Sequence, residues 1–231
     1  MTTIGRGFIA GVAVAPILVC WAATGQAQPF PGGLPACEAH LHACQAASQK
    51  FPATGQTFSF RAGDDGAIQA GATLSYTDNG DGTITDNNTK LIWEKKSDDG
   101  SIHDKDNVYS WFNAFDVHVA TLNATNFAGF NDWRVPNVKE LLSIVDYDKF
   151  FTPKVSSAFN NNCTAGATVL SGSCTAASDY WSSTTNASDP GDQYFVDFGF
   201  VFGTAHVGSA AGLTAFHVRA VRGGLNLGSS Q

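Results

Sequence analysis

The side chains best suited to metal chemistry lie in the run DNGDG at residues 78–82. Oxygen ligands suit calcium, and Thr77, Asn79, Asp81, Gly82 and Ile84 follow positions 1, 3, 5, 6 and 8 of a twelve-residue calcium loop. The candidate ligands are Asn79, Asp81 and Asp86. Two strong ligands are missing, because Thr77 replaces the first aspartate and Asn88 replaces a bidentate glutamate. The run also fits a tight β-hairpin turn, which we favour, with calcium as the alternative.

A second candidate site combines an aromatic residue with a polar loop. Trp181 is followed by the polar residues Asn186, Asp189, Asp192 and Gln193, which predict contacts to a glycan or protein ligand. Large aromatic side chains carry much of a protein's core burial, so Trp181 is also a candidate core residue.

The sequence lacks the usual catalytic motifs: a nucleophile elbow with a Ser-His-Asp set, HExxH, a phosphate loop and CxxC. Asp132 and Asp197 are isolated carboxylates that could act as acid or base. His118 has no second His or Cys at metal spacing, so a core or surface role is expected. We therefore predict a non-enzymatic protein. The net charge of -7 gives no reason to expect binding to nucleic acid or an anionic membrane.

The stretch GFNDWRVPNVKELLSIVD at 129–146 predicts the element around which the chain is organised. Pro136 fixes a rigid turn, and Asn137 stands three residues before Glu140, as in a capping box. Apolar residues at helical spacing then predict a short amphipathic helix. Trp133 and Arg134 are expected to enter the core together, with the guanidinium satisfied by carbonyls or a carboxylate.

Hydrophobic periodicity predicts two further helices, at 37–50 and 109–122. Strands are expected at 73–77, 83–85, 91–93, 180–184, 193–202 and 216–221. The acidic run 97–107 is expected to be a solvated loop, and 147–178 a long loop.

Residues 1–27 have the pattern of an export signal, and no later segment is apolar enough to span a membrane. Export favours disulfides, so Cys163 and Cys174 are predicted to close the small-residue loop between them. Residues 28–51 hold a Pro/Gly linker and a short heptad seam containing Cys37 and Cys44. In a helix these two lie about 10 Å apart, too far to pair with each other, so an interchain bond and a locally bent intrachain bond both remain open. Residues 225–231 are expected to form a disordered tail.

Four motifs in order, DNGDGTITDNNTKLIW, GFNDWRVPNVKELLSIVD, YWSST and VRAVRGG, resemble the exported bacterial family named after the C-terminal domain of the Legionella collagen-like adhesin. The match covers 52–224. The resemblance implies a C-type-lectin-like α+β fold, with two helices flanking a small twisted antiparallel sheet and long loops. It also implies a surface role, trimer formation and binding of sulfated glycans. Arg219 and Arg222 of the last motif are expected to be structural, together with Trp133, Arg134 and Pro136.

Two departures limit this resemblance. Sulfated glycans need clusters of Lys and Arg, which this acidic chain lacks. Formylglycine-generating enzymes share the fold and use a redox-active cysteine pair, but no base neighbours Cys163 or Cys174 in sequence. We therefore expect a secreted, periplasmic or surface-bound adhesin-like module. The alternatives are a structural oligomeric envelope component joined through Cys37 and Cys44, or a hydrolase-like enzyme.

Overall fold

The computed structural model describes residues 51–199 and 205–223. The chain divides into two units, Met1–Ala47 and Ser48–Gln231, and every described residue belongs to the second. The predicted export signal at 1–27, the helix at 37–50 with Cys37 and Cys44, and the tail at 225–231 lie outside the described residues.

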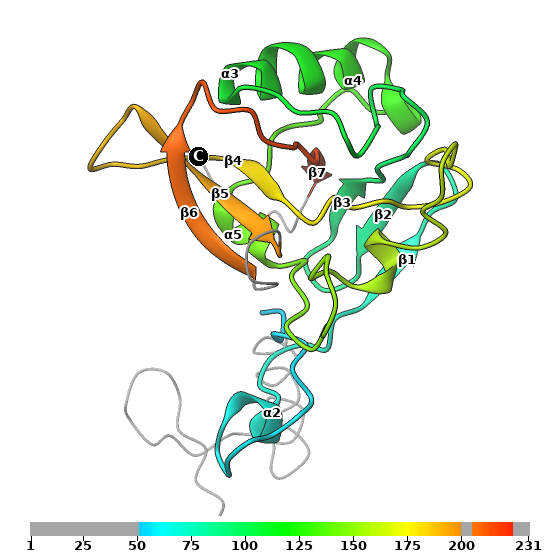
Figure 1. Cartoon of the computed structure of the whole chain (residues 1–231). Coiled ribbons are helices and arrows are strands. Elements are labelled where there is room, and N and C mark those ends of the chain that lie inside the picture. The colour runs from blue at the N-terminus through cyan, green and yellow to red at the C-terminus, as the bar shows by residue number, and fades with distance from the viewer. Residues whose placement is uncertain (1–50, 200–204, 224–231) are drawn as a thin grey trace, which may run out of the picture. The chain divides into compact units, whose positions relative to one another are not determined.

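The first sheet has four antiparallel strands in the order β1-β2-β3-β7 (Figure 1). They are β1 (Tyr76–Asp78), β2 (Thr83–Asp86), β3 (Leu91–Glu94) and β7 (Val221–Gly223). The β1–β2 hairpin confirms the predicted turn, and Gly80 and Gly82 supply its positive φ angles of 76° and 93°. Because β7 pairs with β3, the C-terminal VRAVRGG motif lies beside a strand more than 120 residues earlier.

A second sheet holds β4 (Asp179–Thr185), β5 (Asp192–Phe198) and β6 (Ala205–Ala211) in that order. The sequence predicted one sheet, so its division into two is a correction, while the α+β class is confirmed. Strand β6 was not predicted because AHVGSAA is poor in the β-branched and aromatic residues that favour strands. The predicted strand at 216–221 is also shorter, since only its end joins β7.

The predicted helix at 109–122 runs from Trp111 to Ala124 and contains an unpredicted π-helical centre. Helix α3 (Trp111–Asn113) starts at Ser110, whose side chain accepts the amide of Asn113. The π-helix η1 (Ala114–Val119) follows, and α4 (Ala120–Ala124) completes the run. In the π-helix, His118 and Val119 are both buried, so this segment delivers a histidine into the interior.

Helix α5 (Val138–Leu142) begins as predicted, with a complete capping box between Asn137 and Glu140. It lies against β4 and β5 (Figure 1). One part of the prediction is wrong: Trp133 is buried, but the side chain of Arg134 stays 42% exposed. The guanidinium binds both carboxylate oxygens of Glu140 at 2.7 Å, so its charge is satisfied without entering the core. Short helices complete the domain: α2 (Asp65–Ile68), η2 (Phe127–Gly129) and η3 (Ser157–Phe159).

Two clusters of buried side chains form the core. One joins the two sheets around Trp93, Phe159 and Tyr180. The other packs the Trp111–Ala124 helix against Trp133 and Trp181. Within the described ranges, none of the helices has the length and hydrophobicity that a bilayer crossing requires.

Candidate functional site

The densest group of ionisable side chains surrounds Glu94, at the end of β3. One carboxylate oxygen accepts a hydrogen bond from Nδ1 of His103 at 2.8 Å and contacts Nζ of Lys96 at 3.3 Å. The other accepts from Nε2 of His118 at 2.9 Å and from the backbone amide of Ala220 at 2.9 Å. Four donors from four segments therefore saturate one carboxylate, which is fully buried.

Arg219 extends this network toward the disulfide loop. Its guanidinium donates to the carbonyl of Glu94 at 2.8 Å, to the carbonyl of Cys174 at 2.7 Å and to Oγ1 of Thr175 at 2.7 Å. The central carbon of the Arg219 guanidinium, Cζ, also lies 5.3 Å from the centre of the Phe159 ring. Arg219 has no exposed surface, so the predicted structural role of this arginine is consistent with its contacts. We call Glu94, Lys96, His103, His118 and Arg219 the buried charge network.

Burial and charge act against each other in this network. Burial alone would raise the pKa of Glu94, but attraction to His118 and Lys96 and hydrogen bonds from both histidines hold it well below the ordinary value. Burial lowers the pKa of His118 despite the attraction of Glu94. Hence at neutral pH we assign an ionised Glu94 and a neutral His118 that still donates its Nε2 hydrogen. Burial also lowers the pKa of Lys96, because Glu94 compensates the desolvation only in part.

The buried charge network is arranged to hold segments together. Direct contacts of 2.8–2.9 Å between Glu94 and the histidines leave no room for a metal ion between them. The network also lacks an exposed acid, since Glu94 has no accessible surface. Its chemistry is therefore that of a polar clamp between β3, the π-helix and the C-terminal segment.

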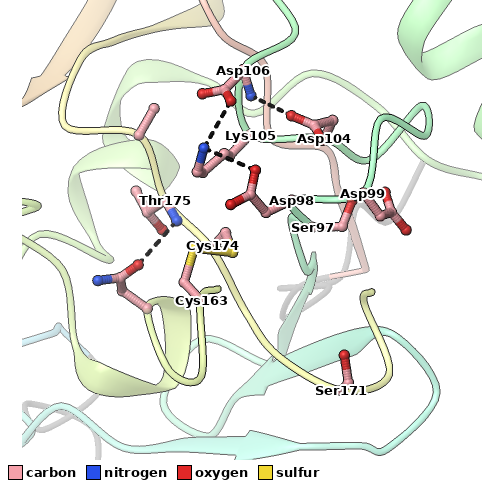
Figure 2. The surroundings of a disulfide bond; sticks show 12 residues. Ser97, Asp98, Asp99, Asp104, Lys105, Asp106, Cys163, Ser171, Cys174 and Thr175 are labelled. Atoms are coloured by element: carbon pink, nitrogen blue, oxygen red, sulfur yellow. Dashed lines mark hydrogen bonds and ion pairs between the residues drawn. A yellow bond between two sulfur atoms is a disulfide. The ribbon is translucent and has the colours of Figure 1, made fainter. Parts of the chain in front are cut away.

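The disulfide is confirmed: Cys163 and Cys174 are bonded, with Cα atoms 5.0 Å apart. The strand-like backbone at Cys174 pairs with Lys96, so the bond fixes the loop against the buried charge network. Figure 2 shows the neighbouring acidic loop, where Nζ of Lys105 reaches Asp98 at 3.1 Å and Asp106 at 2.8 Å.

This acidic loop differs from the solvated run that the sequence predicted. Ser97 has no exposed surface and Asp104 is 6% exposed. Asp98, Asp104 and Asp106 have carboxylate oxygens within 4.8 Å of one another. Among the described residues, they form the one group of three His, Cys, Asp or Glu side chains whose ligand atoms lie this close. The ammonium of Lys105 already lies among them, so the loop supplies its own cation.

The three candidate calcium ligands lie at opposite ends of β2. Asn79 and Asp81 are at the exposed hairpin tip, and Asp81 accepts hydrogen bonds from the amide and hydroxyl of Thr83. Asp86 is buried at the other end, where it accepts three hydrogen bonds from Asn88 and Thr89. Each carboxylate thus stabilises its own turn, and calcium binding stays a prediction.

The predicted ligand-binding residues separate into core and surface. Trp181 has no exposed surface, and its Nε1 donates to the carbonyl of Tyr109 at 2.9 Å, so this indole cannot meet a ligand at the surface. Gln193 is 3% exposed and donates to the carbonyl of Pro190 at 3.3 Å. Trp181 is therefore corrected to a core residue, and Gln193 to a support of the loop between β4 and β5.

Asn186, Asp189 and Asp192 shape that loop from within. Oδ1 of Asn186 accepts the amide of Ser188 at 3.0 Å, and Oδ1 of Asp189 accepts the amide of Gly191 at 3.2 Å. Asp192 accepts a hydrogen bond from Ser209 on β6 at 3.3 Å. The loop is ordered by its own side chains, and its tip, with Ser188 and Asp189, faces solvent.

Arg222 also has contacts that suit a structural role. Arg222 donates to both oxygens of Asp132 at 2.6 and 3.1 Å, and its guanidinium lies 3.6 Å from the centre of the Phe130 ring. The hydrogen bonds from Arg222 lower the pKa of Asp132. Asp132 is therefore an ion-pair partner, and Pro136 is buried beside the turn that it shapes.

Sequence reasoning missed the buried charge network as a unit. Apart from Lys96, the partners of Glu94 lie 9, 24 and 126 residues away, and no local spacing relates them. One signal was available: Glu94 directly follows the apolar run Leu91–Trp93 as the last residue of β3, and Lys96 stands two residues further on.

These features define a small, disulfide-bonded α+β domain in which buried charges hold the scaffold and short polar loops face solvent. The chain belongs to the family of the Lcl C-terminal domain, whose family model matches residues 82–222. The matched range lies within the predicted domain at 52–224. The family is one of bacterial surface-related domains. No curated protein matches the chain.

Proposed function

We propose that the chain is an exported, non-enzymatic, adhesin-like module that binds a glycan or a surface protein. It acts in the periplasm, at the bacterial surface or after secretion. Membership of the Lcl C-terminal domain family supports the surface role. A C-type-lectin-like arrangement of the two helical segments and the antiparallel strands is part of the same proposal.

The observation that carries the proposal is the separation of buried charge from displayed polar groups. The carboxylate of Glu94, at the centre of the buried charge network, is saturated and closed to solvent, which suits a scaffold. The loop between β4 and β5 is held by hydrogen bonds between its own residues and presents its tip outward. A preorganised loop loses little conformational entropy on binding, which favours recognition.

The ligand contacts are assigned to the solvent-facing groups of Asn186, Ser188 and Asp189. Asp189 uses Oδ1 for the amide of Gly191, and its negative charge remains available at the tip. Trp181 is buried in the core and makes no ligand contact in the proposal. Calcium bound at Asn79, Asp81 or Asp86 is a separate part of the proposal.

The test is binding of the whole chain to an array of glycans and matrix proteins, with calcium and with chelator. Asp189→Asn keeps the side-chain acceptor and removes the charge, so we expect weaker binding with unchanged thermal stability. Asp116→Asn, an equal charge loss on the exposed side of the π-helix, is the matched control. Absence of any bound ligand, or equal loss in both variants, contradicts the assignment.

A further inference from the structure

A cavity of about 350 Å³ opens beside helix α5. Residues 51–54 form one wall, and α5 with the loop after it forms the other, through Leu142, Val145 and Tyr147. These residues belong neither to the buried charge network nor to the loop between β4 and β5. The proposed function therefore gives this cavity no role.

Backbone hydrogen bonds hold both walls in place. The amide of Ala72 donates to the carbonyl of Phe51, and its carbonyl accepts the amide of Ala53, both at 2.8 Å. The amide of Tyr147 donates to the carbonyl of Thr54 at 2.9 Å, so the two walls are joined directly. A ligand that enters a cavity with fixed walls costs the protein little conformational entropy.

The cavity offers two polar groups that no protein atom uses. The hydroxyl of Thr54 donates to a carboxylate, and that of Ser143 donates to a backbone carbonyl at 2.7 Å, so both are satisfied. Of the described residues that line the cavity, Lys139 alone is charged. Within the part of the chain that the structure describes, neither the ammonium of Lys139 nor the hydroxyl of Tyr147 has a hydrogen bond or ion pair.

These two groups favour a carboxylate. An ammonium and a phenol hydroxyl both donate, and a carboxylate has two oxygens that only accept. Burial raises the pKa of Tyr147 above its ordinary value of 10, so its hydroxyl keeps the proton at neutral pH. Phosphate and sulfate favour clusters of cations or the bidentate fork of arginine, and the described lining contains neither.

The volume limits the apolar part of such a ligand. One water takes about 30 Å³ of the liquid, so the cavity holds roughly a dozen atoms of that size. An alkyl chain of about eight to ten carbons, or one aromatic ring on a short linker, fills this space. Lysine places its methylene stem along apolar surface and its ammonium in water, so the exposed Lys139 puts its charge at the mouth.

We propose that the cavity binds a small carboxylic acid with an apolar body, and that Lys139 and Tyr147 hold the carboxylate. The apolar body packs against Pro52, Leu142 and Val145. This site is separate from the ligand contacts proposed on the loop between β4 and β5, and it binds a different class of molecule.

The first test is calorimetric titration of the whole chain with hexanoate, octanoate, decanoate and dodecanoate. The Kd should fall about fourfold for each added methylene and stop falling once the chain fills the cavity. A Kd that falls at the same rate throughout the series indicates detergent-like binding and contradicts the proposal. Titration with 4-phenylbutyrate, compared with octanoate, distinguishes an aromatic from an alkyl body.

The second test removes the charge from each partner in turn. Lys139→Gln should raise the Kd of octanoate about tenfold, as loss of a charge-assisted hydrogen bond does, and should leave the Kd of uncharged 1-octanol unchanged. Tyr147→Phe should raise the Kd of octanoate about threefold. Lys90→Gln is the matched control, because this exposed lysine does not line the cavity.

Ala53→Leu adds bulk to the wall and should abolish binding, with thermal melts without ligand to check the fold. If this variant does not fold, Lys139→Gln and Tyr147→Phe still decide, since both side chains are exposed. Absence of binding to every acid, equal loss in the two lysine variants, or equal loss of octanoate and octanol in Lys139→Gln would overturn the proposal. The glycan array probes a different loop, so either experiment can fail while the other succeeds.

Discussion

Glu94 and Glu140 are two carboxylates with similar partners in different surroundings. Each accepts one backbone amide: that of Ala220 at Glu94 and that of Asn137 at Glu140. The side-chain donors are His103, His118 and Lys96 at Glu94, and Arg134 at Glu140. The side chain of Glu94 is 0% exposed, whereas that of Glu140 is 19% exposed beside a 42% exposed arginine. The contacts are alike, but water screens only the second set.

This difference determines what each glutamate contributes to stability. A buried charge whose partner is lost remains in a low-dielectric interior, where it costs several kcal/mol. A partly exposed charge regains water when its partner is lost, so exposed pairs contribute about 0–1 kcal/mol. The two sites therefore allow the role of burial to be measured with the hydrogen-bonding chemistry held nearly constant.

The largest effect is expected for Glu94→Ala. The substitution leaves Lys96 buried without its carboxylate and removes the negative charge near Arg219, which keeps its backbone partners, and should lower the free energy of unfolding by about 3–5 kcal/mol. Equilibrium denaturation in urea measures this loss. Asp106→Ala, at an exposed carboxylate paired with Lys105, is the control and should cost less than about 1 kcal/mol.

If Glu94→Ala does not fold, Glu94→Gln keeps the size and the acceptor oxygen while removing the charge. It should still be clearly less stable than Asp106→Asn. Similar small losses at both positions would show that the buried charge network contributes no more than a surface pair, and the comparison would fail.

A smaller effect is expected from pH. Burial lowers the pKa of His118 from 6.5, so as pH falls below about 6.5 the unfolded chain takes up this proton first. The stability associated with neutral His118 is therefore complete above pH 6.5 and is lost as pH falls toward the lowered value. The pKa of Glu94 adds a further loss only below its ordinary value of 4.5.

Urea midpoints measured at several pH values between 7 and 5 test this expectation. His118→Gln should flatten the dependence, because glutamine can still donate to Glu94 but does not titrate. The dependence should not vanish, since burial also lowers the pKa of His217. An unchanged slope in His118→Gln would show that His118 does not take part in the pH response.

The same two glutamates show what the sequence could predict. Glu140 was identified because its capping partner is three residues away and the spacing is a local signal. The hairpin at 78–82 and the Cys163–Cys174 bond are also local features, and both were predicted. Glu94 was missed because its partners other than Lys96 come from three separate segments.

Burial explains the remaining errors. Trp181 and Arg134 are both amphipathic, and sequence alone does not state which end of such a residue meets water. The indole of Trp181 is buried, and the backbone carbonyl of Tyr109 accepts its N–H. Arg134 stayed at the surface because Glu140, brought close by the turn at Pro136, already satisfies its guanidinium.

The smallest effect is expected for Glu140→Ala. The substitution removes the acceptor for the Asn137 amide and the partner of Arg134, and should cost about 1 kcal/mol. Lys139→Ala, at the exposed neighbour on α5, is the control. High salt should shrink the cost of Glu140→Ala, because it screens the exposed pair, but should leave the cost of Glu94→Ala nearly unchanged. A similar salt response at both glutamates would mean that water reaches Glu94, and burial could not then be the cause of the difference.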